Sequence, residues 1–502
     1  MMRLAAGPLL ALLLLIVATA TVTNAQLPPS PPTNPPVPPT SRDPDWLPPF
    51  QRADLLYSPG PRPDFEALLP IENCTESCPD SGCDFKSKCS ALWWPGLGNG
   101  FLGSIAQGPT LRISGFHSGY HGRYTAGKQG IIPPEPYHGF SNKEFAYRAS
   151  IPAFASSIVM QSPALLPGSS RAALNTREAV YTERSSLSGG GKLELRTYFH
   201  QTRRNLIVVE VELDCTNCTE SSEISLRAFS RPELSDVVFH ERGPEAAAAG
   251  AGAAGTPPRQ LLGVLHAPEN CEPSNSHLYN TNQTLGYVHD LCPQKLTALP
   301  GQTAVVQLLS VLTVSSEDSE AAAAEEDAVV SRAMKVYTDA KATSPAQLLS
   351  EHRQGWAALW AAGGIELSTN ELALQQTTNS TLYYLLMSTR PDWLYSTMVP
   401  STIAASAPKP HGYFGTAFWD QDTFQAPPLM VFYPEIAKNF LQNRLFQLPS
   451  YLSNAKAFGL KGYASVQTIR VFSSRQILNC NFAQTGSGQR WNLQLTQPVN
   501  CA

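Results

Sequence analysis

The middle of the chain alternates short hydrophobic runs with turn-forming residues. Residues 192–199, 205–213 and 303–314 each alternate apolar with polar side chains or run almost continuously apolar. Such runs between turn signals are typical of β-strands. The Ala/Gly-rich residues 246–255 favour a loop or an insert. We therefore predict an all-β domain over residues from about 60 to 315.

The hydrophobic pattern becomes helical after Glu317. The chain is acidic and alanine-rich through Tyr337, and residues 347–360 repeat apolar side chains at about 3.6 residues, which predicts helix. Residues 434–446 and 449–458 predict the next clear helices. On the helix over residues 347–360, one face would carry Leu348, Leu349, His352, Trp356, Leu359 and Trp360.

The first residues have the features of a secretory signal. Arg3 supplies a positive charge, residues 9–18 an apolar core, and Thr23-Asn24-Ala25 a cleavage site of small residues. The apolar core is too short to span a bilayer comfortably, so an uncleaved anchor is disfavoured. Residues 26–50 are rich in proline and predict an extended polyproline II spacer. We expect a protein that is secreted or lies in the lumen of the secretory pathway, with no membrane contact after signal cleavage.

Composition supports export and excludes some classes of partner. The 502 residues carry a net charge of -4, so they give no reason to expect nucleic acid or an anionic membrane as partner. Only 15% of residues are charged and 43 are proline, which suits a secreted, loop-rich protein.

The ten cysteines are expected to form disulfides, because their number is even in a chain that carries an export signal. Cys215 and Cys218 also have the spacing of zinc ligands. No matching pair of His or Cys follows at the distance of a zinc finger, so we expect no metal. The cysteines are grouped as Cys74, Cys78, Cys83 and Cys89; Cys215 and Cys218; Cys271 and Cys292; and Cys480 and Cys501.

Four Asn-Xaa-Ser/Thr tripeptides are candidate glycosylation sites. They begin at Asn73, Asn217, Asn282 and Asn379, and the first two have cysteine in the middle position. A glycan is bulky and solvating, so each glycosylated asparagine must face solvent.

The candidate chemistry lies in residues 412–424. Glycines and small residues lead into Trp419, Asp420 and Asp422, and Pro434 suits the first turn of the following helix. We therefore expect the aromatic and the two acids in an irregular segment at the mouth of a helix. An indole beside a carboxylate suits a sugar site, since the ring covers C–H groups while the acid accepts hydroxyl hydrogen bonds. A buried tryptophan beside a helix-capping aspartate would give the same local pattern.

Three blocks of sequence, residues 418–422, 433–437 and 454–462, resemble glycoside hydrolase family 65 in order and spacing. Within the family, the similarity is to the branch of glucosylgalactosyl-hydroxylysine glucosidases and acid trehalases. The resemblance implies that Trp419 and Asp420 contact a carbohydrate substrate, with Asp422 as a possible accessory residue. It implies no cofactor.

The resemblance also implies a multidomain fold of β and α parts. An N-terminal β-super-sandwich, which would open with the Gly-rich residues 98–103, is followed by a helical linker and the first part of an (α/α)6 toroid, incomplete in this chain. Residues 377–389 would be the first toroid helix. The expected division is signal peptide 1–25, Pro-rich linker 26–50, β-sandwich domain 51–316, helical linker 317–368, partial catalytic domain 369–462 and an unrelated polar tail 463–502.

The implied reaction is hydrolysis with inversion, in which one carboxyl protonates the leaving oxygen and a second carboxylate activates water. In the family the acid is a Glu well downstream of the Trp-Asp block, and a Trp-Glu-Ser-Ala motif follows the Gly-Leu-Lys-Gly block. After Gly462 that motif is missing, and the chain contains no Asp or Glu after Glu435. No catalytic residue is therefore identified, and we expect this form to be inactive.

Three functional classes follow from these features. The first is an inverting α-glucosidase acting on the terminal glucose of glucosylgalactosyl-hydroxylysine or trehalose. The second is a secreted carbohydrate-binding protein without turnover. The third is a disaccharide phosphorylase, which export disfavours because a sugar phosphate made outside the cell is not readily recovered.

Overall fold

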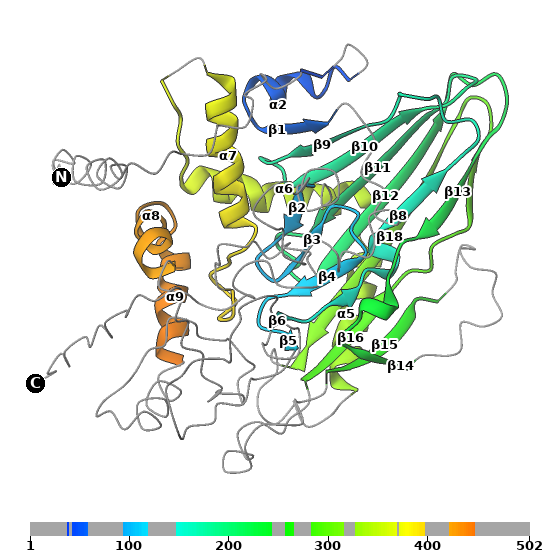
Figure 1. Ribbon diagram of the computed structural model, residues 1–502. Helices are drawn as coiled ribbons and strands as arrows, with labels where there is room; N and C mark the ends of the chain where they lie inside the picture. Colours follow the sequence, from blue (N-terminus) through cyan, green and yellow to red (C-terminus); the bar gives the residue numbers. More distant parts are fainter. Residues whose placement is uncertain are drawn as a thin grey trace, which may run out of the picture. The chain divides into compact units, whose positions relative to one another are not determined.

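The computed structural model describes a chain built around one large β-sheet (Figure 1). All described residues belong to one compact unit, Val37–Ala502. The described residues are 38–39, 43–58, 94–118, 147–242, 257–265, 283–315, 327–368, 371–396 and 421–446.

Within the described ranges the large sheet has nine strands, and every neighbouring pair is antiparallel. The strands predicted over residues 192–199, 205–213 and 303–314 are confirmed as three central members, β11, β12 and β18. In spatial order the sheet contains β1 (Leu55–Ser58), β9 (Arg171–Asn175), β10 (Val180–Ser186), β11 (Lys192–Phe199), β12 (Leu206–Cys215), β18 (Gln302–Val314), β16 (Gln283–His289), β15 (Arg259–Leu265) and β14 (Val238–Glu241).

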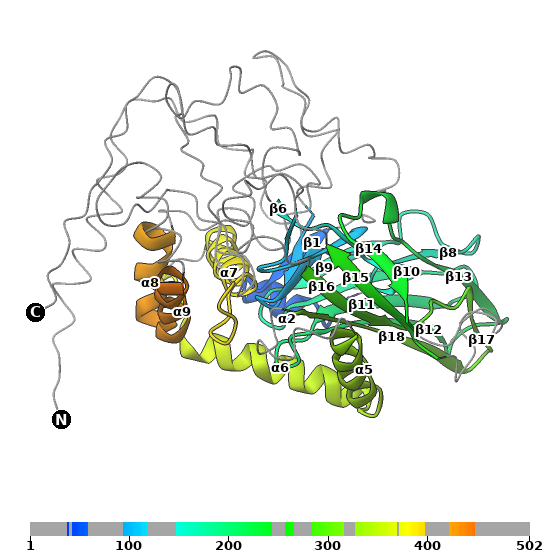
Figure 2. The same ribbon diagram turned by 90° about the horizontal axis from the view of Figure 1, so that it is seen from below.

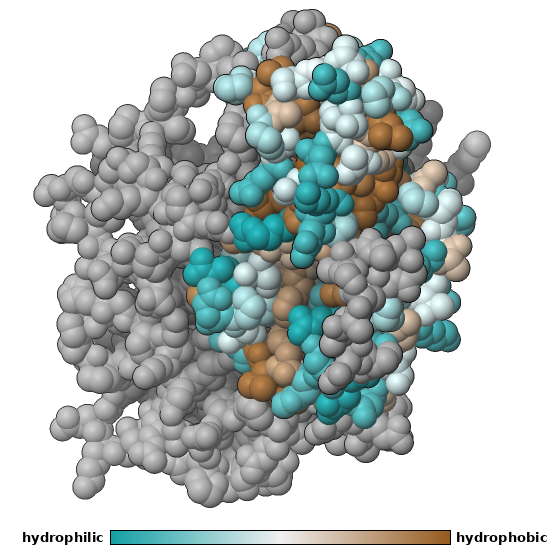
Figure 3. All heavy atoms as spheres, turned by 90° about the vertical axis from the view of Figure 1, so that its right-hand side faces the viewer, coloured by the Kyte–Doolittle hydropathy of each residue, from teal (hydrophilic) through white to brown (hydrophobic). Residues whose placement is uncertain are grey.

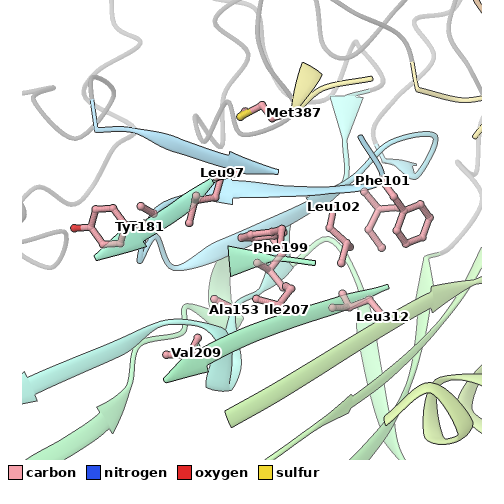
Figure 4. Packing of buried hydrophobic residues seen from close by; sticks show 14 of the residues in the cluster. Leu97, Phe101, Leu102, Ala153, Tyr181, Phe199, Ile207, Val209, Leu312 and Met387 are labelled. Atoms are coloured by element: carbon pink, nitrogen blue, oxygen red, sulfur yellow. The ribbon is translucent and has the colours of Figure 1, made fainter. Parts of the chain in front are cut away.

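Smaller sheets accompany the large one. The main apolar cluster joins Leu97, Phe101 and Leu102 with Phe199 and Ile207 of the large sheet, as Figure 4 shows. One face of the large sheet is therefore buried under the Gly-rich hairpin. The smaller sheets are β2 (Gly96–Gly98), β3 (Leu102–Ile105), β4 (Thr110–Ile113) and β7 (Ile151–Pro152); β17 (Lys295–Ala298), β13 (Ser222–Ala228) and β8 (Ile158–Gln161); and β5 (His117–Ser118) with β6 (Tyr147–Arg148).

The opposite face of the large sheet is covered by helix α5 (Ala328–Lys341), followed by α6 (Pro345–Ala362), as Figure 2 shows. Leu206 and Val208 of β12 face a cluster with α5, whereas Ile207 and Val209 face the main core. Burial on both faces explains why β12 is almost continuously apolar at its start.

The helices predicted between residues 317 and 368 are thus present in the described part of that range. Leu348, His352, Trp356 and Trp360 of α6 are buried, as the predicted face requires. Trp356 and Trp360 belong to the main apolar cluster. The expected helical linker is therefore packed as part of the core, because the aromatic face of α6 contacts the sheet domain.

The folded part begins earlier than the expected boundary at residue 51. Helix α2 (Leu47–Gln51) lies partly within the range assigned to the Pro-rich linker, and Trp46 and Phe50 are buried against Leu55. Asp43 forms an ion pair with Arg171 of the sheet. Two aromatic side chains four residues apart share one side of a helical turn, which attaches this segment to the sheet.

Among the described residues of the part expected to begin the toroid there are three α-helices. They are α7 (Leu372–Leu386), α8 (Ala426–Phe432) and α9 (Pro434–Phe446). Helix α9 has the predicted bounds, whereas α7 begins five residues before the expected Thr377. The helix predicted over residues 449–458 lies outside the described residues.

Candidate functional site

The candidate site begins at a π-helical turn, Gln421–Gln425, which leads directly into α8. Trp419 and Asp420 lie outside the described residues, and of Asp422 only the backbone is described. The expected irregular segment is helical from Gln421 onward. Pro427 and Pro428 lack the N–H groups that would extend ordinary α-helical hydrogen bonds back over this turn.

Gln421, directly after Asp420 in the chain, is fully buried. Neither its amide nitrogen nor its amide oxygen has a hydrogen-bond partner among the described residues. Leaving a buried polar group unmatched costs about 1–3 kcal/mol, so buried amides are normally paired. Gln421 is therefore a polar group of this turn that sequence reasoning did not single out.

The segment after α7 is held by Arg390, whose guanidinium is almost completely buried. One guanidinium nitrogen donates to Asn99 O at 2.9 Å and to Gln201 O at 3.2 Å. The other side of the fork pairs with the Asp392 carboxylate, at 2.6 Å from Nε. Partial burial raises the pKa of Asp392, but hydrogen bonding to Arg390 outweighs it and the net pKa is lowered. Arg390 thus ties two turns of the sheet domain to the start of the helical part.

Helix α9 is attached to the same segment through Asn439. Its Nδ2 donates to Trp393 O at 2.8 Å and to Arg390 O at 3.0 Å. Trp393 in turn donates from Nε1 to Ser114 O at 2.9 Å. A chain of hydrogen bonds therefore runs from the sheet domain through residues 390–393 to α9, the second helix after the candidate site.

The Gly-rich hairpin has a packing role at this junction. Gly100 has φ +82°, and a Cβ there would lie 2.5 Å from Thr389 O. Its N–H donates to Met387 O at 2.7 Å. Only glycine combines this backbone conformation with so close an approach, so the turn seats the end of α7.

Glu435 does not have the environment of a buried proton donor. It lies in the first turn of α9 with 69% of its side chain exposed, and pairs with Lys438 at 3.2 Å. A general acid of a glycosidase needs a raised pKa, which burial or a neighbouring negative charge supplies. Among the described residues, no group of three or more His, Cys, Asp or Glu is placed to hold a metal ion.

The four predicted glycosylation sites differ in their positions. Asn217 is exposed. It lies next to Cys215 and Cys218, which form a disulfide with each other rather than a zinc site. Asn73 and Asn282 lie outside the described residues.

Asn379 is buried, with 5% of the residue exposed, and the expectation that it faces solvent is wrong. Its Nδ2 donates to Asp54 Oδ1 at 3.0 Å and to Ala53 O at 3.2 Å. The nitrogen that would carry a glycan is therefore used to attach α7 to the N-terminal segment.

Asn99, Arg390 and Asn439 were not found from the sequence. A signal was present for Asn439, because Asn439 and Asn443 stand four residues apart on the side of α9 that also carries Ile436 and Phe440. Polar residues on a buried helix face require partners. The partners themselves come from segments that the sequence does not identify.

Replacing Arg390 with alanine should lower the free energy of unfolding by about 2 kcal/mol, because the buried carbonyl of Asn99 and the partly buried carbonyl of Gln201 lose their donor. Urea denaturation would measure the change. Arg353→Ala is the matched control: Arg353 pairs with Glu178 at 2.9 Å with 50% and 37% of the two side chains exposed. Such a surface pair contributes less than about 1 kcal/mol. Equal effects of the two substitutions would contradict the role given to Arg390.

Comparison with known proteins identifies a family that part of this chain resembles. Residues 394–489 match the sequence model of the glycosyl hydrolase family 65 central catalytic domain. The matched range includes Trp419, Asp420 and Asp422, and it extends beyond Gly462 into the residues expected to be an unrelated tail. The resemblance to this family is confirmed, while the boundary at residue 463 stays a prediction.

Individual relatives agree with the family match. The chain is 24% identical over 380 residues to the protein-glucosylgalactosylhydroxylysine glucosidase of Dictyostelium discoideum, covering 73% of this chain and 45% of that protein. It is 25% identical over 224 residues to the periplasmic/secreted acid trehalase of Candida glabrata, covering 42% of this chain and 18% of the relative. The chain thus spans less than half the length of either relative.

A solved structure is similar in fold. It is a putative kojibiose phosphorylase from the human microbiome, with a TM-score of 0.55 and 12% sequence identity, covering 86% of this chain and 53% of that chain. At this identity the likeness concerns the fold alone.

No helix in the part of the chain that the structure describes is long and apolar enough to cross a membrane.

Proposed function

We propose that this relative of glycoside hydrolase family 65 binds the terminal glucosyl unit of a disaccharide, as an inverting α-glucosidase does. The observation that carries the proposal is the match of residues 394–489 to the family's central catalytic domain, with the Trp419-Asp420 block inside it. The names of the relatives, which include a kojibiose hydrolase of Mucilaginibacter mallensis, point to three substrates: the glucosylgalactosyl-hydroxylysine unit, trehalose and kojibiose.

In the proposed complex Trp419 covers the C–H face of the glucose ring, and Asp420 accepts hydrogen bonds from its hydroxyls. Both interactions suit a sugar, because a flat aromatic ring and a charged acceptor match its apolar face and its polar rim. Asp422, two residues on at the π-helical turn, is the accessory acid. The hydrogen-bonded junction of Arg390 and Asn439 supports the helix that follows.

Hydrolysis with inversion also needs a proton donor on the opposite side of the bond from the water-activating carboxylate, with the two carboxyls roughly 6.5–9.5 Å apart. Asp420 and Asp422 are too close in sequence to bracket a sugar easily. Glu435 is exposed, and no acidic residue follows it in the 502 residues. We therefore propose that these residues bind the glucosyl unit without cleaving it. Glucose release by this chain at ordinary enzymatic rates would overturn that part of the proposal.

Asp420→Ala is the direct test of the sugar contact. Loss of a charged acceptor should weaken disaccharide binding at least ~10-fold, since a hydrogen bond to a charged group contributes about 1.5–3 kcal/mol. Titration calorimetry with trehalose, kojibiose and the hydroxylysine-linked disaccharide would measure the dissociation constants. In a version that carries a downstream proton donor, the same substitution should sharply reduce turnover.

Glu435→Ala is the matched control, because it removes an exposed carboxylate near the site and should leave the affinity unchanged. Undiminished affinity in Asp420→Ala would remove the proposed sugar contact. Disaccharide binding by the wild-type chain without glucose release would support the proposal that these residues bind the sugar without cleaving it. A product that forms only when inorganic phosphate is supplied would instead identify a phosphorylase.

We further propose that the chain is secreted or lumenal. The signal-like residues 1–25 support export, and one relative is named as periplasmic or secreted. Detection of the chain in the medium of expressing cells would test this.

A further inference from the structure

The turn between β12 and β13 combines two chemistries on one residue. Cys218 is joined to Cys215 by a disulfide. The same Cys218 is the middle residue of the glycosylation tripeptide Asn217-Cys218-Thr219. The disulfide therefore ties the tripeptide to a residue that precedes it in the chain.

Hydrogen bonds and close packing hold this turn in a folded conformation. Cys218 N–H donates to Cys215 O at 3.1 Å, and Thr219 N–H donates to Gly189 O at 3.3 Å in the neighbouring β10–β11 turn. Gly190 approaches so closely that a Cβ there would lie 2.8 Å from Asn217 O. Backbone hydrogen bonds thus hold Cys218 and Thr219, and Asn217 lies close against Gly190.

The closed turn differs from the conformation that a modifying enzyme must bind. The Cα atoms of Cys215 and Cys218 are 4.8 Å apart, whereas three extended residue steps span roughly 10 Å. An enzyme that recognises Asn-Xaa-Thr has to bind three consecutive residues at once, against its own surface. While the disulfide is closed, Asn217 and Cys218 lie inside the ring of residues 215–218, which restricts how far the first two residues of the tripeptide can extend.

We propose that Asn217 accepts a glycan only while Cys215 and Cys218 are thiols, so that disulfide closure ends the period in which this site can be modified. The inference rests on the proposed export of the chain. In the glycosylation step the Asn217 amide nitrogen bonds to the anomeric carbon of a lipid-linked donor, the C–O bond to its pyrophosphate breaks, and the nitrogen loses one proton. In the closing step the two thiols give two protons and two electrons to the disulfide of an oxidoreductase, which becomes a dithiol.

Closure of the disulfide prevents later glycosylation of Asn217, whereas glycosylation does not prevent later closure of the disulfide. Asn217 and Thr216 are exposed, and the Asn217 amide nitrogen donates a 3.5 Å hydrogen bond to Thr216 Oγ1. A glycan attached first would extend into water without blocking closure. Figure 3 views the right-hand side of Figure 1, towards which β12 and β13 extend, and shows hydrophilic residues interspersed with hydrophobic ones. Occupancy at Asn217 is thus set by a competition between two rates.

Site occupancy in the full chain, expressed in secretory eukaryotic cells, tests the proposal. Peptide mass spectrometry would compare the glycosylated fraction of Asn217 in the wild type, in Cys215→Ser and in Cys218→Ser. Both substitutions leave an Asn-Xaa-Thr tripeptide and remove the disulfide, so both should raise occupancy several-fold. Cys292 was expected to form a disulfide but is a free cysteine in the structure. Cys292→Ser therefore removes a thiol outside the turn, and as the matched control it should leave occupancy unchanged.

A second measurement does not depend on how the variants fold. Newly made wild-type chain, labelled while a dithiol reductant keeps its cysteines reduced, should also show several-fold higher occupancy at Asn217. Equal occupancy in the wild type and Cys215→Ser, whether high or low, would overturn the proposal. Absence of glycan from every tripeptide in all variants would overturn both this inference and export, while leaving disaccharide binding by Asp420 untouched.

Discussion

Lowering the pH from 7 to 5 should destabilise the fold by several kcal/mol, because three buried histidines are neutral in the folded state. Burial lowers the pKa of His200 and of His289 from 6.5 to about 4, and that of His352 to about 3. In this window the unfolded chain binds more protons than the folded chain. Stability is therefore fully present above pH 6.5 and is lost as the pH falls towards 4, by roughly 2 kcal/mol for each histidine at pH 5.

The contacts of His352 and His200 give the physical reason. His352 Nδ1 accepts a hydrogen bond from Gln201 N–H at 3.2 Å, and Nε2 lies 2.8 Å from Glu178 O, to which it donates. His200 Nδ1 accepts from Arg203 N–H at 3.1 Å. A second proton on either ring would face a backbone N–H donor. A positive His352 ring would also be repelled by Arg353 and by a protonated His200. A positive His200 ring would be repelled by Arg203, and Glu351 offsets only part of this.

The pKa of His289 is lowered by a different set of contacts. Its ring is stacked on Phe154 with centroids 5.0 Å apart, and its Nδ1 bonds to Asp290 O at 2.8 Å. Its pKa is lowered mainly by complete burial and further by Arg259, against the opposing effects of Asp290 and Glu241. The charged form of the ring would lose its hydration inside the core, which is costly.

His352→Gln isolates one of these contributions. The glutamine amide can accept from Gln201 and donate to Glu178 without titrating, so the loss of stability between pH 7 and 5 should shrink by roughly 2 kcal/mol. Urea denaturation at the two pH values would measure the difference. The exposed His240 supplies the control, since His240→Gln should leave the pH dependence unchanged. An unaltered pH dependence in His352→Gln would show that this ring is protonated without cost.

Gly286→Ala should lower the free energy of unfolding by about 3 kcal/mol or more, near the upper end of what overpacking costs. Gly286 lies in β16 where α5 crosses the sheet, and a Cβ there would lie 2.8 Å from Val330 N and still closer to Val329 O. The obstructing atoms are backbone, and Val329 O is held by Thr313 Oγ1 at 2.6 Å. The helix can make room only by moving away from the sheet, which thermal unfolding would detect.

Gly364→Ala is the matched control for this prediction. No atom lies within 4 Å of the Cβ position at Gly364, so alanine there should be neutral or slightly stabilising. A Gly286→Ala protein as stable as Gly364→Ala would mean that α5 is not pressed against the sheet at this point.

Local patterns predicted the regular elements well. The runs over residues 192–199 and 303–314 are β11 and most of β18, and Pro434 begins α9 as expected. These elements follow from side-chain periodicity and from the missing N–H of proline, which act over a few residues. The Trp419-Asp420 block was likewise identified as a short motif, and the family match includes it.

The junction that supports the candidate site was not predictable in this way. Arg390 donates to Asn99 O, 291 residues away in sequence, and Asn379 donates to Asp54 Oδ1, 325 residues away. Neither partner is marked by a local pattern, because a backbone carbonyl or a carboxylate oxygen accepts from any donor that the fold brings near.

The sequence by itself determined the central strands, the helices α5, α6 and α9 and the Trp419-Asp420 motif, since each depends on neighbouring residues. Only the tertiary structure decided which polar side chains are accessible. Asn217 and Asn379 carry the same modification signal, yet one is exposed in a turn and the other is buried against the N-terminal segment. Burial is a property of the packed chain, and it is fixed by contacts between segments that the local sequence does not encode.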